Sequence, residues 1–104
     1  MGNFFTQLPG DHSREHFQSL LEGKSCRVER IISYGQSSPE TGWYDQDEHE
    51  WVLVLSGYGV IEMENGERHH LGKGDNLLIR ANQRHRVVET AADEATIWLA
   101  VFFQ

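Results

Sequence analysis

Residues 50–66 read EWVLVLSGYGVIEMENG, and this stretch decides the fold. Its first seven residues are largely apolar on both faces of an extended chain, which is typical of a central strand buried on both sides. Gly57-Tyr58-Gly59 interrupts that strand, and residues 60–64 then alternate between apolar and acidic side chains. Asn65-Gly66 indicates a hairpin, because a two-residue type I′ turn needs positive φ at both positions. The stretch therefore predicts two successive antiparallel strands.

Strand patterns continue on both sides of this stretch, separated by turns that are often rich in glycine. The expected strands cover residues 26–33, 67–71, 76–79, 85–90 and 96–103. Residues 13–22 are the exception, since Phe17, Leu20 and Leu21 recur at spacings of three and four, as on one side of a helix. The pattern predicts an all-β sandwich or barrel with one N-terminal α-helix packed outside it.

Length and composition narrow the class of protein. The 104 residues fit a single domain, in which we expect an N-terminal segment, residues 1–34, and a barrel core, residues 35–104. The formal net charge of −7 argues against nucleic acid or an anionic membrane as a partner. The longest apolar run, residues 97–103, is far too short to span a membrane. The single cysteine, Cys26, excludes an intrachain disulfide, so we expect a cytoplasmic protein.

Two segments carry a recognisable spacing. Glu50 is followed by six residues and then Gly57, and Gly74-Asp75 stands before a short apolar run that leads to His85. These segments resemble the two motifs of the cupin superfamily, whose fold is a double-stranded β-helix, or jelly roll. The resemblance implies that Glu50 and His85 project into the barrel from neighbouring strands. It also implies a small-molecule or metal site at that place.

The chain departs from the family before Glu50, where the first cupin motif has a His-x-His pair. One possible count places Trp43 and Asp45 at those positions, and the other places Tyr44 and Gln46 there. The usual cupin metal site, three His and one Glu, is therefore not expected.

A reduced metal site remains one hypothesis. Glu50 and His85, with Asp45 at the barrel mouth, could hold Fe, Mn, Ni or Zn if water completes the coordination. The alternative is that Glu50 pairs with an inward Arg27 or Arg30 and that no metal is bound. His49 should point away from the interior, because adjacent residues of a regular strand face opposite sides.

Aromatic and basic residues near the expected mouth indicate a ligand pocket. Trp43 and Tyr44 could line it, and Arg80 and Arg84 could hold a carboxylate or phosphate of a ligand. The alternatives are that the aromatic residues pack on the barrel exterior and that the arginines lie in a solvated loop.

Three classes of function follow: a metal-binding cupin such as an isomerase or oxygenase, a non-catalytic ligand-binding cupin, and a metal-free structural cupin. The fold alone does not choose among them. Residues 50–56 and 96–103 are apolar on both faces, which is more than one barrel interior can bury. We therefore expect the surplus face to be covered by the N-terminal segment or by a second subunit, and we expect a homodimer.

Overall fold

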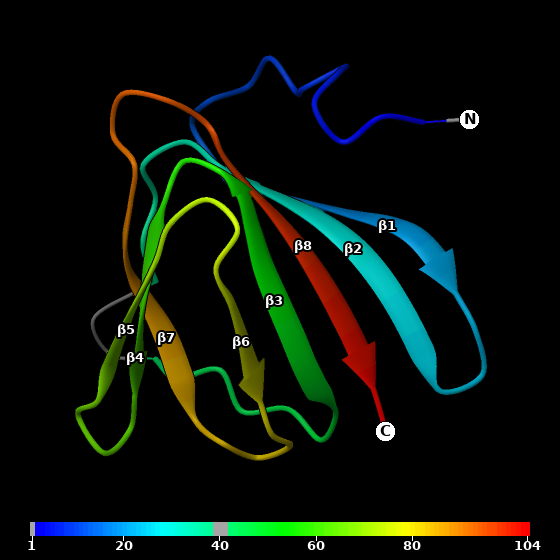
Figure 1. Cartoon of the computed structure of the whole chain (residues 1–104), viewed down its shortest axis with the longest axis vertical. Coiled ribbons are helices and arrows are strands. Elements are labelled where there is room, and N and C mark those ends of the chain that lie inside the picture. Colours follow the sequence, from blue (N-terminus) through cyan, green and yellow to red (C-terminus); the bar gives the residue numbers. More distant parts are fainter. Residues whose placement is uncertain (1, 39–41) are drawn as a thin grey trace.

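The computed structural model describes residues 2–38 and 42–104, which form two facing β-sheets (Figure 1). One sheet has the strand order β1-β2-β8-β3-β6, and the other has the order β5-β4-β7. The strands are β1 (His16–Glu22), β2 (Cys26–Ser33), β3 (His49–Ser56), β4 (Gly59–Met63), β5 (Arg68–Leu71), β6 (Asn76–Ile79), β7 (His85–Thr90) and β8 (Thr96–Phe103). Neighbouring strands pair antiparallel, which confirms the predicted all-β jelly roll. Within the described ranges no helix is long and apolar enough to cross a membrane.

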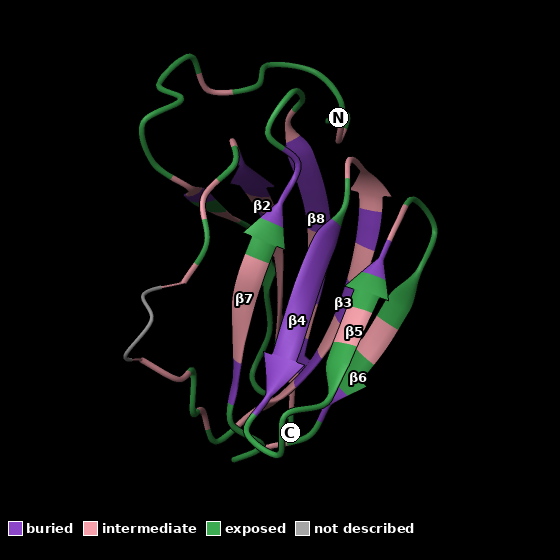
Figure 2. Cartoon of the chain, turned by 90° about the vertical axis from the view of Figure 1, so that its left-hand side faces the viewer, coloured by how far each residue is buried: buried purple, intermediate pink, exposed green. Residues whose placement is uncertain are grey.

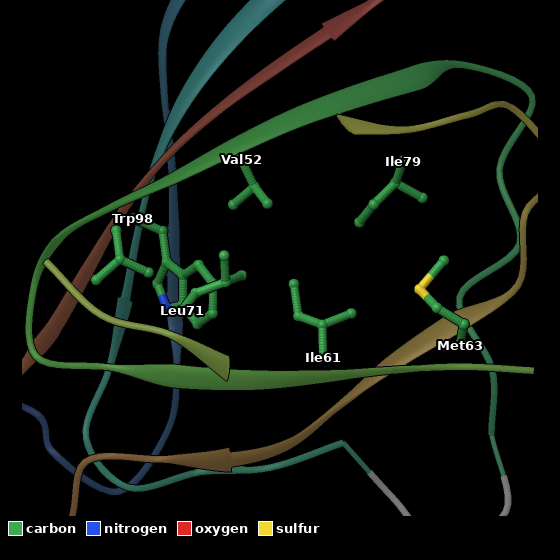
Figure 3. Packing of buried hydrophobic residues seen from close by; sticks show 7 residues of the cluster. Val52, Ile61, Met63, Leu71, Ile79 and Trp98 are labelled. Atoms are coloured by element: carbon green, nitrogen blue, oxygen red, sulfur yellow. The ribbon is translucent and has the colours of Figure 1, made fainter. Parts of the chain in front are cut away.

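The hydrophobic core lies between the two sheets. Figure 3 shows Val52 of β3 and Ile79 of β6 pointing across the gap toward Ile61 and Met63 of β4. All four side chains are almost fully buried. Since alternate residues of a strand face the same side, Glu50 points inward with Val52. The central strand therefore brings one carboxylate to the border of an apolar core.

The β4–β5 hairpin contains the predicted Asn65-Gly66 turn, but the turn differs from the expected type. Strand β4 is buried along its whole length (Figure 2), and Met63 at its end donates its N–H to the carbonyl of Glu67 at 2.8 Å. Gly66 has a φ of 92°, whereas Asn65 is not among the residues with positive φ. The loop is therefore a three-residue turn closed by a left-handed glycine, and the predicted two-residue type I′ turn is wrong. Asn65 instead caps the loop by accepting the N–H of Glu67 at 2.9 Å.

The predicted N-terminal helix is wrong, because residues 16–22 form strand β1 and pair with β2. A β-bulge between Ser19 and Leu21 interrupts the regular alternation of this strand. Phe17, Leu20 and Leu21, although spaced as on a helix, belong to this extended chain. They are 57%, 50% and 66% exposed, so they do not form the packed stripe of a surface helix.

The N-terminal segment covers part of the outward face of the five-stranded sheet. Arg30 on this face of β2 donates hydrogen bonds to the carbonyls of Phe4, Thr6 and Gln7 at 2.9–3.3 Å. Ile32, two residues further along the same face, is fully buried. The rest of the face carries several half-buried apolar residues and the exposed Leu78; the half-buried ones are Val28, Trp51, Leu53, Leu99, Val101 and Phe103.

Candidate functional site

A cavity of about 220 Å³ lies between the two sheets. Much of its wall is the apolar core itself, because Val52, Ile61 and Ile79 belong to both. Trp98 and Phe102 of β8 add aromatic surface. The volume lies below the roughly 300–1,000 Å³ of common ligand pockets, so a ligand would have to be small.

Glu50 and His85 meet at the wall of this cavity, but they come from strands of opposite sheets and not from the neighbouring strands that were expected. Glu50 lies near the start of β3, and His85 is the first residue of β7 in the opposite sheet. His85 Nε2 lies 3.6 Å from Glu50 Oε1, and the two residues are 4% and 8% exposed. The side-chain amide of Gln46 donates a hydrogen bond to the same Glu50 oxygen at 3.1 Å. A buried carboxylate and a buried imidazole are thus held face to face.

The hydrogen-bond partners of His85 determine where its proton is held. Nδ1 lies 3.0 Å from the carbonyl oxygen of Gln83, which can only accept, so Nδ1 carries a hydrogen. In the neutral ring, Nε2 would then turn a lone pair toward the Glu50 carboxylate. Burial lowers the pKa of His85, but the Glu50 carboxylate and the Gln83 carbonyl outweigh it, and the net result is a raised pKa. The pair therefore favours an imidazolium next to a carboxylate.

This raised pKa predicts a pH-dependent contribution to stability. Protonated His85 should stabilise the fold fully below about pH 6.5, its unfolded-state pKa, and this contribution should disappear as the pH rises through the folded-state pKa. Glu50→Gln removes the carboxylate that raises the pKa of His85. As the pH rises, the free energy of unfolding of this variant should therefore fall less than that of the wild type. Denaturant unfolding at about pH 5.5 and about pH 8.5 measures the difference.

Glu64→Gln is a matched control for that measurement, because Glu64 is half exposed and pairs with Arg84 away from the cavity. The free energy of unfolding of Glu64→Gln should change with pH as that of the wild type does. An identical pH dependence in wild type and Glu50→Gln would contradict the proposed coupling of the two side chains.

The residues before Glu50 are not arranged as the metal-site hypothesis requires, with Asp45 beside Glu50 and His85. Tyr44 and Gln46 line the cavity, whereas Asp45 between them is not part of the lining. Asp45 instead lies 3.5 Å from Arg84 in an ion pair in which both side chains are about half exposed. Adjacent residues of an extended chain face opposite sides, so Asp45 cannot share the orientation of its two neighbours. Of the two possible motif counts, the one that puts Tyr44 and Gln46 at the His-x-His positions agrees with the geometry.

Three of the four predicted ligand-binding residues, Trp43, Arg80 and Arg84, are not part of the cavity lining. Arg84 is bound by Glu64 and Asp45, and Arg80 is exposed with its N–H bonded to the side chain of Gln83. Trp43 lies under the guanidinium of Arg86, at 4.4 Å from ring centroid to Cζ. Tyr44 alone of the four lines the cavity, with its ring centroid 5.6 Å from that of His85.

The arginines offered as partners for Glu50 are engaged elsewhere. Arg30 holds the N-terminal segment on the outward face, as described above. Arg27 makes ion pairs with Glu29 and Glu48. His49 also points outward, where its Nδ1 accepts the N–H of Ala81 at 2.9 Å.

Two carboxylates of the cavity, Glu15 and Glu29, were not identified from the sequence, and Arg27 was named only as a possible inward partner of Glu50. Arg27 and Glu29 of β2 line the cavity, as does Glu15 just before β1. The signal was present in residues 26–33, CRVERIIS, where Arg27 and Glu29 alternate with apolar Val28 and share a face with Ile31. Glu15 was hidden within the predicted helix.

The donor set of the cavity does not fit a cupin metal. Glu50 and His85 supply one carboxylate and one imidazole, and Tyr44 and Gln46 stand where the family resemblance expects two more imidazoles. Among residues 2–38 and 42–104, no three His, Cys, Asp or Glu side chains are grouped to hold a metal ion. Transition-metal sites in proteins usually have three or four such donors.

The fold and the paired motif residues together define the class. A family model described as a cupin domain matches residues 30–102, and the chain therefore belongs to the cupin superfamily. A comparison with curated proteins gave no significant match.

Solved structures support the same assignment. A candidate mannose-6-phosphate isomerase from Ralstonia eutropha JMP134 is 45% identical, with a TM-score of 0.95 over 100% of this chain and 97% of that one. A cupin superfamily protein from Desulfitobacterium hafniense DCB-2 is 14% identical, with a TM-score of 0.76 over 92% of this chain and 83% of that one. An RmlC-like cupin from Desulfovibrio desulfuricans is 15% identical, with a TM-score of 0.76 over 98% and 94% of the two chains. The last two likenesses concern the fold alone.

Proposed function

We propose that this cupin binds a small organic molecule in the cavity between its sheets and that Glu50 and His85 exchange a proton with it. The observation that carries the proposal is the buried pair itself, 3.6 Å apart at the wall of a largely apolar cavity. A perturbed ionisable pair at the wall of a cavity is a candidate functional site. No metal ion is part of the proposal, because the donor set does not fit one.

The pair is suited to general acid–base chemistry. The pKa of His85 is raised from its ordinary value, and an imidazole can both donate and accept a proton. Glu50 supplies a carboxylate base beside it. Both groups are themselves buried, which strengthens their electrostatic interaction with a bound molecule.

Sugar isomerisation is one reaction in this class. It moves a proton between adjacent carbons, and a carboxylate base with an imidazole acid can catalyse such a transfer. The 45% identical relative from Ralstonia eutropha is named as a candidate mannose-6-phosphate isomerase. Mannose and mannose 6-phosphate are therefore among the compounds to test.

The proposal predicts binding that is confined to the cavity. In methyl NMR spectra, mannose and benzyl alcohol should shift the resonances of Val52, Ile61, Ile79 and Val87, which line the cavity. For any compound whose C–H proton exchanges with solvent, Glu50→Gln should slow the incorporation of deuterium from D₂O by about 100-fold or more. Glu64→Gln should leave both readouts unchanged. If no compound shifted the cavity methyl groups, the proposal would be overturned.

We also propose that the half-buried apolar face around Trp51 and Val101 is covered by a second copy of the chain. The N-terminal segment bound by Arg30 leaves this part of the sheet open, and large exposed apolar faces are uncommon in monomers. Sedimentation equilibrium at micromolar concentration should give twice the chain mass of 12.0 kDa. Trp51→Glu should give the monomer, and Glu64→Gln should remain dimeric. A wild-type species of 12.0 kDa at high concentration would contradict the dimer.

A further inference from the structure

The charged residues around the cavity are mainly acidic. Among the described residues, 2–38 and 42–104, its lining contains three glutamates, Glu15, Glu29 and Glu50, and one cation, Arg27, besides His85. The lining therefore has a formal charge of −2 when His85 is neutral and −1 when His85 is protonated. An anionic ligand would meet repulsion in either state, and its burial would be costly.

Arg27 does not offset this charge for an incoming anion. Its Nε lies 3.3 Å from Glu29, and its terminal nitrogen is bonded to Glu48. Both carboxylates are largely covered, at 18% and 20% side-chain exposure. A guanidinium that already has two carboxylate partners has little net charge left for a third.

Aromatic rings complete the lining and favour a cation. Phe17, Tyr44, Trp98 and Phe102 all contribute to the wall. The guanidinium carbon of Arg27 lies 4.0 Å from the centroid of Phe102, so one cation already rests on an aromatic face of this lining. Ring faces attract cations, and the attraction is stronger where water is excluded.

We propose that the cavity recognises a small organic cation, an amine or ammonium group on a short apolar body, and rejects phosphorylated and carboxylated molecules. This inference rests on the proposed function, since it assumes that the ligand enters the same cavity. The charged end of the ligand would lie near Glu50. Gln46 donates a hydrogen bond to Glu50 but is neutral, so the charge of Glu50 is uncompensated when His85 is unprotonated. The apolar body would lie against the aliphatic and aromatic wall.

Three small probes that share a benzene ring but differ in charge test this selectivity. Benzylamine, benzyl alcohol and benzoate have similar size, and engineered apolar cavities of about 150 Å³ already hold benzene. We expect benzylamine to bind at least about ten-fold more tightly than benzyl alcohol, a difference of about 1.4 kcal/mol. Benzoate should cause no shift of the cavity methyl groups. Mannose should likewise bind more tightly than mannose 6-phosphate.

Variants then test which carboxylate provides the selectivity. Glu50→Gln should reduce benzylamine binding about ten-fold and leave benzyl alcohol unchanged, whereas Glu64→Gln should alter neither. The charge selectivity would be overturned if benzyl alcohol or benzoate bound in the cavity at least as tightly as benzylamine, or if mannose 6-phosphate bound there at least as tightly as mannose. Either result would leave the proposed function standing. If none of the probes shifted the cavity methyl groups, both proposals would fail together.

Discussion

Replacing Trp98 by alanine is expected to lower the free energy of unfolding by about 3–5 kcal/mol, the usual range for a buried large aromatic residue. Trp98 is 3% exposed and belongs to both the core cluster and the cavity wall. Its indole N–H donates to the hydroxyl of Ser33 at 3.2 Å, so truncation also removes a buried hydrogen bond. Denaturant unfolding measures the loss.

Two further variants make the Trp98 result interpretable. Leu21→Ala removes a side chain that is 66% exposed and should change the free energy of unfolding by less than about 0.5 kcal/mol. Trp98→Phe keeps most of the apolar volume and should remain folded if Trp98→Ala does not. A loss in Trp98→Ala no larger than that in Leu21→Ala would contradict the described core.

Gly57→Ala is the second substitution with a large expected effect, about 2–5 kcal/mol. Gly57 has a φ of 77°, and a Cβ built there would lie 2.5 Å from Thr96 Oγ1 and 2.8 Å from Thr96 Cα. The left-handed backbone costs an alanine about 1–2 kcal/mol. The overlap with the buried strand β8 adds about 1–3 kcal/mol, because the backbone of Thr96 has to move.

Gly66→Ala separates the two contributions at Gly57. Gly66 also has a left-handed φ, 92°, but a Cβ there would have no other heavy atom within 4 Å. It should therefore show only the backbone cost. Equal losses of unfolding free energy in the two variants would mean that the close approach of Gly57 to β8 has no energetic effect.

The centre of the fold could be predicted because local and long-range signals agreed there. Strand β3 is apolar on both faces, and the structure places it between β8 and β6. Strand β1 could not be predicted, because Phe17, Leu20 and Leu21 are spaced as on a helix, whereas the segment is held extended by its pairing with β2. The type of the turn at Asn65-Gly66 depends on how the two strands meet, which the dipeptide does not determine.

The site was predictable to the extent that it follows from spacing. The cupin spacing identified Glu50 and His85, and their approach is confirmed, while their chemical role stays a proposal. The choice between Asp45 and its neighbours depended on one residue of register, which reverses every side-chain direction. The net charge of the cavity could not be predicted from the sequence. It depends on Glu15 and on residues of β2, which join the lining only through the tertiary arrangement of the strands.

The attachment of the N-terminal segment to Arg30 has a consequence for how this protein can vary in evolution. The three acceptors that the segment offers to that arginine are main-chain carbonyls, which every amino acid supplies. The side chains of Phe4, Thr6 and Gln7 can therefore change without loss of these bonds. Selection to keep the segment in place would act on Arg30. The N-terminal segment can therefore vary in sequence and still follow the same path over the sheet.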